Sequence, residues 1–166
     1  MIRDHFRVLV ADLTTGRGTV VLEDGRDEVA GGSGLAARLF ARYGRPEAPW
    51  DHPDQPLILA IGPLTGAFPL MSKTVFAFKS PYHDQYTESH AGGRSALALR
   101  FADLDALVVV GRAAVTSFLD LGSHHFALRS AGFLAGMDVQ ESGRLLRRMT
   151  PGSGHRTILR IGPAGE

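Results

Sequence analysis

The spacing of apolar residues changes twice within the first third of the chain. Residues 6–11 and 18–23 are extended, β-branched runs with a glycine-containing turn between them, which predicts a β-hairpin. Residues 33–43 carry apolar side chains at helical spacing, and the prolines of 45–56 predict a loop after that helix. Residues 57–61 are all apolar and predict a buried strand.

The last third of the chain follows a similar order. Residues 106–111, 116–121 and 126–129 predict short strands around a second turn. A capping box at Asp138 predicts a second helix, and residues 157–161 predict a further strand.

Each series ends in the tripeptide Ile-Gly-Pro, at 61–63 and at 161–163. We interpret this match as an internal duplication of a β-β-α-β unit, with halves of about 6–66 and 106–166 joined by 67–105. Because hairpins connect the strands and each half has one helix, we expect an α+β fold with mainly antiparallel sheets.

Length and composition narrow the class of protein. Residues 1–166 are enough for a single domain that buries a core without disulfide or metal support. The chain has no cysteine, so it cannot hold a disulfide, a cysteine-ligated zinc or a thiolate-bound iron–sulfur cluster by itself. Eighteen scattered basic residues against 17 acidic ones argue against nucleic acid as a partner. No signal peptide or membrane span is recognisable, so we expect a soluble, cytoplasmic protein without a membrane partner.

Glycine is enriched, and two clusters of small residues are candidate binding segments. The clusters are Gly31, Gly32, Ser33, Gly34 and Ala91, Gly92, Gly93. The first begins the predicted first helix, where exposed backbone N–H groups suit an anion. The alternative is purely local, with Ser33 as the N-cap and the glycines serving packing or a turn.

Most of the remaining candidate chemistry lies within residues 71–93. The only lysines, Lys73 and Lys79, flank an aromatic strand; such lysines are usually solvated, and phosphate pairing is the less common alternative. Polar and titratable side chains crowd the positions that follow: Tyr82, His83, Asp84, Tyr86, Glu88 and His90. This crowding is typical of a solvated loop. Its other interpretation is a metal or acid–base site, such as a metal hydrolase built on His83, Asp84 and His90.

Three arginines of the second predicted helix, Arg144, Arg147 and Arg148, are interpreted as a solvated face.

A series of short motifs in fixed order resembles one known family. The motifs are LVADLTTGRG (9–18), GGSGLAARL (31–39), IGPLTG (61–66), KSP (79–81), ESHAGG (88–93), LRFADLDALVVVG (99–111) and IGPAGE (161–166). Together they resemble the N-terminal domain of the aldehyde ferredoxin oxidoreductase family, the tungsten bis-pterin enzymes. The resemblance covers nearly the whole chain.

The resemblance implies a base of two similar halves on which two pterins sit. It implies a tungstopterin cofactor (bis-molybdopterin with tungsten or molybdenum) and a magnesium ion that bridges the pterin phosphates. The segments expected to contact it are Gly31–Gly34, the strand around Lys73 and the loop His90–Gly93, with His90 at the metal position. The implied reaction oxidises a small aldehyde to a carboxylic acid, and the electrons pass to ferredoxin.

Three residues depart from the family pattern. Ser33 and Lys73 stand where arginine is usual, and His90 stands where asparagine is usual. Ser and Lys lack the fork of a guanidinium, and histidine is a poor ligand for magnesium, which prefers oxygen.

The family's [4Fe–4S] cysteines and catalytic groups follow the IGPAGE motif, outside these residues. We therefore expect a pterin-binding domain or subunit that is completed by C-terminal domains or by a separate subunit carrying the iron–sulfur cluster. The alternative is a stand-alone, cofactor-free binding module descended from this domain. A homodimer is compatible with either.

Overall fold

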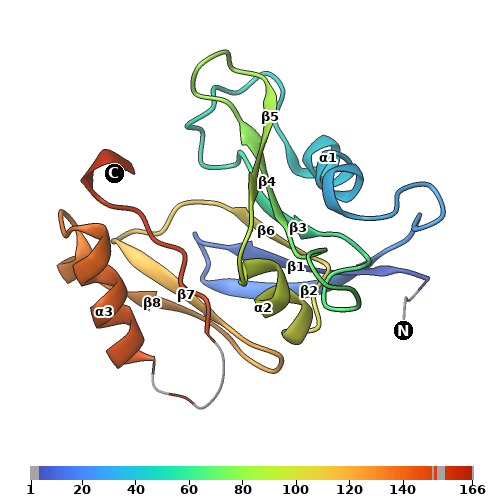
Figure 1. Cartoon of the computed structure of the whole chain (residues 1–166). Helices are drawn as coiled ribbons and strands as arrows, with labels where there is room; N and C mark the ends of the chain where they lie inside the picture. The colour runs from blue at the N-terminus through green and yellow to red at the C-terminus, as the bar shows by residue number, and fades with distance from the viewer. Residues whose placement is uncertain (1–3, 151, 153–155, 166) are drawn as a thin grey trace.

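A computed structural model describes residues 4–150, 152 and 156–165 of the chain (Figure 1). The strands are β1 (Phe6–Asp12), β2 (Arg17–Glu23), β3 (Leu57–Ile61), β4 (Thr74–Lys79), β5 (Tyr86–Ala91), β6 (Ala106–Val110), β7 (Ser117–Leu121) and β8 (Phe126–Ser130). The α-helices are α1 (Gly32–Tyr43), α2 (Ser95–Phe101) and α3 (Val139–Met149). Short 3₁₀ turns lie at Gly132–Leu134 and Pro163–Gly165.

Six strands form one mixed sheet in the order β2-β1-β6-β3-β4-β5, and β7 and β8 form a separate hairpin. Strand β1 pairs with β6 in parallel, and the other pairings of the described strands are antiparallel. The expected α+β class with mainly antiparallel pairing is confirmed. The hairpin of β1 and β2, helix α1 and strand β3 lie where the apolar spacing predicts them.

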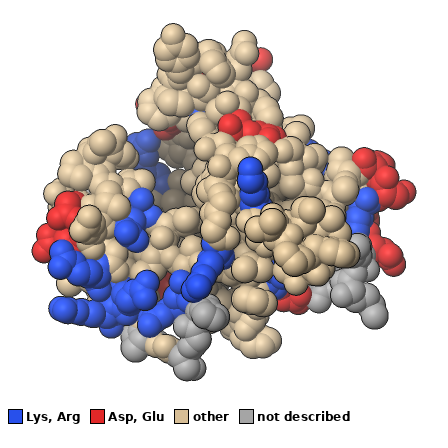
Figure 2. Space-filling model, viewed as in Figure 1, with Lys and Arg blue, Asp and Glu red and all other residues tan. Residues whose placement is uncertain are grey.

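Charge is distributed unevenly over this fold. Figure 2 shows Lys and Arg side chains gathered at the lower left, where Figure 1 places α3 and the segment that follows it. Residues 138–160 contain five arginines and two carboxylates, although the whole chain has a formal charge of only +1.

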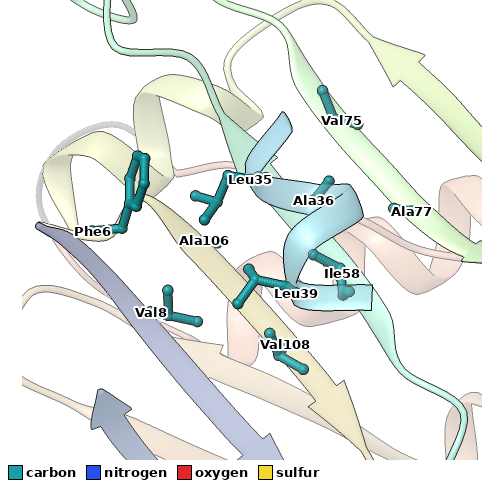
Figure 3. Close-up of a cluster of buried hydrophobic side chains, with 11 residues drawn as sticks. Phe6, Val8, Leu35, Ala36, Leu39, Ile58, Val75, Ala77, Ala106 and Val108 are labelled. Atoms are coloured by element: carbon teal, nitrogen blue, oxygen red, sulfur yellow. The ribbon is translucent and has the colours of Figure 1, made fainter. Parts of the chain in front are cut away.

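Both faces of the six-stranded sheet are covered, which explains why its central strands are apolar throughout. Helix α1 packs on one face through Leu35, Ala36 and Leu39, each at most 1% exposed (Figure 3). The other buried members of this cluster are Phe6, Val8, Ile58, Ala60, Val75, Ala77, Ala106 and Val108. Alanines at 60, 77 and 106 lie among the larger side chains of this cluster, and we infer that their small size lets the helix approach the strands closely.

The opposite face of the sheet packs on α2 and on the β7–β8 hairpin. Leu9 of β1, Leu59 of β3 and Leu107 of β6 contribute to a second buried cluster with Ala96 and Leu99 of α2. Partly buried side chains of the hairpin pack against it: Leu119, Leu121 and Phe126.

The internal duplication is not shown by this fold. Strand β6, which begins the expected second half, lies between β1 and β3 of the first half. The prediction of a strand at 157–161 is wrong: these residues pair with no strand in the described part of the chain, and Leu159 and Ile161 are 54% and 63% exposed. Helix α2 is an addition that the sequence pattern did not predict. Positions 151, 153–155 and 166 of the expected second half lie outside the described residues.

None of the helices in the described ranges is long and apolar enough to cross a membrane.

Candidate cofactor-binding site

Helix α1 begins against the end of strand β3. Gly31 is the N-cap residue, at φ 129°, and a Cβ there would lie 3.0 Å from the carbonyl oxygen of Ile61 and 3.3 Å from Pro63 Cδ. Glycine is therefore required at Gly31 by backbone conformation and by the close approach of the two segments. The alternative interpretation of Ser33 as the N-cap is wrong, because the N-cap is Gly31 and no side chain of the described residues caps this helix.

Four other glycines have no close neighbour at the Cβ position, although Gly32 (φ 55°) and Gly93 (φ 92°) have a left-handed backbone conformation that favours glycine. A Cβ built on Gly32, Gly62, Gly92 or Gly93 would meet no atom within 4 Å. Gly34 differs, since its Cβ would lie 3.2 Å from Val29 Cβ. Bare backbone that faces open space is therefore present at the start of α1, after β3 and after β5.

One carboxylate joins the two predicted binding segments. Ser33 Oγ donates a hydrogen bond of 2.7 Å to Glu88 Oε2, and His90 Nε2 lies 3.0 Å from the same oxygen. The hydroxyl of Tyr86 donates to Glu88 Oε1. Two residues that lie 57 positions apart in the sequence, Ser33 and His90, are thereby held on one side chain of β5.

These contacts set the ionisation of the cluster. Burial alone would raise the pKa of Glu88, but the hydrogen bonds from Ser33, Tyr86 and His90 outweigh it, and the pKa lies below its ordinary value. The pKa of Tyr86 is strongly raised, first by burial and then by its hydrogen bond to Glu88. At neutral pH the cluster therefore contains a carboxylate and a neutral phenol.

The end of β5 leads directly into α2. Ala91 pairs with Thr74 of β4, and Gly92 and Gly93 connect this pair to the helix. A buried hydrogen bond of 2.7 Å between Thr74 Oγ1 and Ser95 Oγ fixes the start of α2. The open backbone at Gly92 and Gly93 is thus held between two ordered elements.

Arg100 of α2 holds the loop after β3. Its guanidinium donates hydrogen bonds of 3.2 Å to the carbonyl oxygens of Gly62 and Thr65. It also forms an ion pair of 3.3 Å with the buried Asp105. Arg100 lies within the LRFADLDALVVVG motif, but the sequence does not predict its role in holding this loop. Glu88 is one of the candidate titratable residues, and its role in joining Ser33 to His90 was not predicted.

The two lysines have different environments. Lys73 is exposed and makes no hydrogen bond or ion pair with the described residues; it precedes the Thr74–Ala91 pair and so lies at the Gly92 end of the sheet. Lys79 is buried, and its ammonium contacts the carbonyl oxygens of Pro46 and Ala48 at 2.9 and 2.6 Å. Lys79 therefore ties the proline-rich loop to β4.

The candidate metal groups do not assemble into one cluster. His90 lies near the last residue of β5, whereas His83 and Asp84 lie in the turn before the strand begins, and Asp84 pairs with Lys79. In the described ranges no group of three or more His, Cys, Asp or Glu side chains is arranged to hold a metal ion. The hydrolase interpretation on His83, Asp84 and His90 therefore has no support in this geometry.

Residues 8–166 match the sequence family described as aldehyde ferredoxin oxidoreductase, N-terminal domain. Relatives named tungsten-containing aldehyde ferredoxin oxidoreductase come from Pyrococcus furiosus and Thermococcus kodakarensis. Each is 33% identical over 96% of this chain and 27% of the relative's length. The chain thus spans about a quarter of the length of these relatives.

A solved structure shares this fold. It is described as the active site complex BamBC of benzoyl coenzyme A reductase in complex with 1,5-dienoyl-CoA. The TM-score is 0.80 at 27% identity, and the match covers 87% of this chain and 23% of that chain.

Proposed function

This chain belongs to the aldehyde ferredoxin oxidoreductase family as its N-terminal domain, and we propose that it is the pterin-binding part of a tungsten-dependent aldehyde oxidoreductase. The complete cytoplasmic enzyme would oxidise a small aldehyde to a carboxylic acid and pass the electrons to ferredoxin. One observation carries the proposal: open glycine backbone at the start of α1, after β3 and after β5 is brought together by the Gly31–Ile61 approach and the Ser33–Glu88–His90 hydrogen bonds.

The arrangement fits a large flat cofactor at these glycines. Only a residue without Cβ leaves its amide accessible to a ring system, and Gly32, Gly92 and Gly93 have free space where a Cβ would stand. The proposed contacts are Gly31, Gly32, Ser33, Gly34, Lys73, His90, Ala91, Gly92 and Gly93. Tungstopterin, with tungsten or molybdenum, would supply the two-electron chemistry.

The phosphate end of such a cofactor would face a different environment. Ser33 and Glu88 offer a hydroxyl and a carboxylate where a fixed guanidinium would pair with phosphate directly. A magnesium ion held by Glu88 would offset the repulsion between this carboxylate and the phosphates, since magnesium prefers oxygen ligands and Glu88 places a carboxylate beside His90. We propose that Glu88 rather than the His90 ring supplies the oxygen donor at the predicted metal position.

Other parts of the enzyme would complete the site. The chain has no cysteine, so a [4Fe–4S] cluster belongs to C-terminal domains or to a separate subunit. The loop after β3 exposes apolar side chains, with Leu70 98% and Phe68 59% exposed. Exposed apolar clusters of this kind commonly mark interaction surfaces, and we assign this loop to contact with the completing region.

The decisive experiment produces the chain together with the coding region or neighbouring gene that supplies the remaining part. Tungsten, molybdenum and pterin are then measured per mole of purified complex. We expect pterin and metal to copurify with the complex and aldehyde oxidation to reduce ferredoxin. A well-folded complex without pterin would reject the proposal and leave the cofactor-free module, which is supported by the departures from the family pattern at Ser33, Lys73 and His90.

The likeness to the benzoyl coenzyme A reductase complex supports a second reaction class, the reduction of an acyl coenzyme A. Assaying the purified complex with aldehydes and with benzoyl coenzyme A distinguishes the two reactions.

A further inference from the structure

A groove lies between α3 and the segment that follows it, apart from the site described above. Its volume is about 320 Å³, and it is lined by Gln140, Gly143, Arg144, Arg147 and Arg160. The first four have the spacing i, i+3, i+4 and i+7, which places them on one face of α3, and Arg160 comes from the extended segment beside that face. We call this feature the arginine groove.

Gly143 allows Arg160 to reach this groove. A Cβ at Gly143 would lie 2.7 Å from Arg160 Cζ, so the guanidinium lies directly against the backbone of α3. Glycine inside a helix is unfavourable by about 1 kcal/mol relative to alanine. We therefore infer that glycine occupies this position in α3 because it leaves room for the Arg160 side chain.

The positive charge of the groove is only partly balanced by the described residues: Arg144 interacts with Asp138 and helps to hold the pKa of that carboxyl below its ordinary value, after the backbone hydrogen bonds from Glu141 and Gln140. Arg144, Arg147 and Arg160 form no ion pair with a carboxylate among the residues that the structure describes. Asp138 is the N-cap residue of α3, and its carboxylate accepts hydrogen bonds of 2.7 and 2.9 Å from the backbone N–H groups of Gln140 and Glu141. Figure 2 shows basic side chains gathered over this part of the surface.

We propose that the arginine groove binds a small ligand carrying a phosphate or diphosphate group. Guanidinium groups form paired, charge-assisted hydrogen bonds with phosphate oxygens, and three of them line one cavity here. The volume lies at the lower end of the range of small-molecule sites. Bringing three like charges together beside a single carboxylate, Asp138, is unfavourable, and a bound anion reduces that repulsion. The proposal is independent of pterin binding at α1.

The test uses the 166-residue chain and inorganic pyrophosphate as the probe, titrated by calorimetry at constant ionic strength. We expect Arg147→Gln to weaken binding about tenfold or more, because a charge-assisted pair is lost. Arg148→Gln is the matched control: it removes the same charge from the neighbouring position, which does not line the groove, and we expect less than a twofold change.

Gly143→Ala supplies a second test that leaves the charge unchanged. The added methyl group displaces Arg160, so we expect several-fold weaker pyrophosphate binding. The thermal midpoint should not fall, since alanine favours the helix. The proposal is overturned if Arg148→Gln weakens binding as much as Arg147→Gln, if Gly143→Ala binds like the wild type, or if the wild type does not bind. Tighter binding of a glutamate-rich peptide than of pyrophosphate would likewise overturn it in favour of an acidic protein partner.

Discussion

Substituting the glycines of the candidate site separates those that the fold needs from those that a ligand needs. Gly31 has φ 129°, a conformation that costs other residues about 1–3 kcal/mol. Its Cβ would also lie 3.0 Å from the Ile61 carbonyl oxygen, and relieving such crowding costs a further ~1–3 kcal/mol. Gly31→Ala should therefore lower the free energy of unfolding by about 2–6 kcal/mol.

Substitutions at two other glycines of the site provide a comparison for the expected effect of Gly31→Ala on the free energy of unfolding. Gly32 has φ 55° and free space around its Cβ position, so Gly32→Ala should cost about 1 kcal/mol, from the left-handed conformation alone. Gly92 has neither a left-handed conformation nor a neighbour within 4 Å, and Gly92→Ala should be neutral or stabilising by up to ~1 kcal/mol, because alanine restricts the unfolded chain.

Urea unfolding of the three variants, followed by circular dichroism, measures the series. If the free energy of unfolding depends on urea concentration with the same slope in all variants, differences in midpoint report differences in stability. The reasoning is refuted if Gly31→Ala changes the free energy of unfolding by less than about 1 kcal/mol, or if Gly92→Ala is as destabilising as Gly31→Ala.

Three further predictions concern the core, the ionised cluster and the buried lysine. Leu39→Ala should lower the free energy of unfolding by about 2–5 kcal/mol, because Leu39 is 1% exposed, whereas Leu22→Ala, at 57% exposure, should change it little; urea unfolding of both variants checks this. The pKa of Glu88 is lowered by folding, so its contribution to stability is present above its ordinary pKa of 4.5 and is lost as the pH falls through the lower folded-state pKa. The stability difference between wild type and Glu88→Gln should therefore shrink as acid is added below pH 4.5, and a constant difference would show that the carboxylate charge is not involved. Lys79→Met keeps the aliphatic stem but removes the donor to the Pro46 carbonyl, so it should lower the free energy of unfolding by about 1–3 kcal/mol in the same assay. An unchanged midpoint would show that Lys79 does not stabilise the fold by holding this loop.

Much of the fold follows from local pattern. The β1–β2 hairpin, α1 and β3 were predictable because their apolar residues repeat at one period and end at glycine or proline. Residues 157–161 have a similar local pattern but no strand partner among the described residues. Pairing depends on a neighbouring edge that local spacing does not encode.

The candidate site was predictable in part. Glycine clusters at 31–34 and 92–93 are visible in the sequence, and their backbone proves open at Gly32, Gly92 and Gly93. Their connection through Glu88 was not predictable, because it depends on the antiparallel register that places β5 beside the start of α1. Arg100 was missed for the same reason: its carbonyl partners lie more than 30 positions earlier in the chain.

The central claim is that glycine backbone after β5 is kept bare for a pterin cofactor. The most direct measurement is the pterin content of the assembled complex carrying Gly92→Val, with Gly132→Val as the control. Gly132 lies in a 3₁₀ turn, outside the proposed contact segments, and a Cβ there also meets nothing within 4 Å. We predict that Gly92→Val assembles with much less pterin while Gly132→Val retains the wild-type amount. Full pterin content in the Gly92→Val complex would contradict the account.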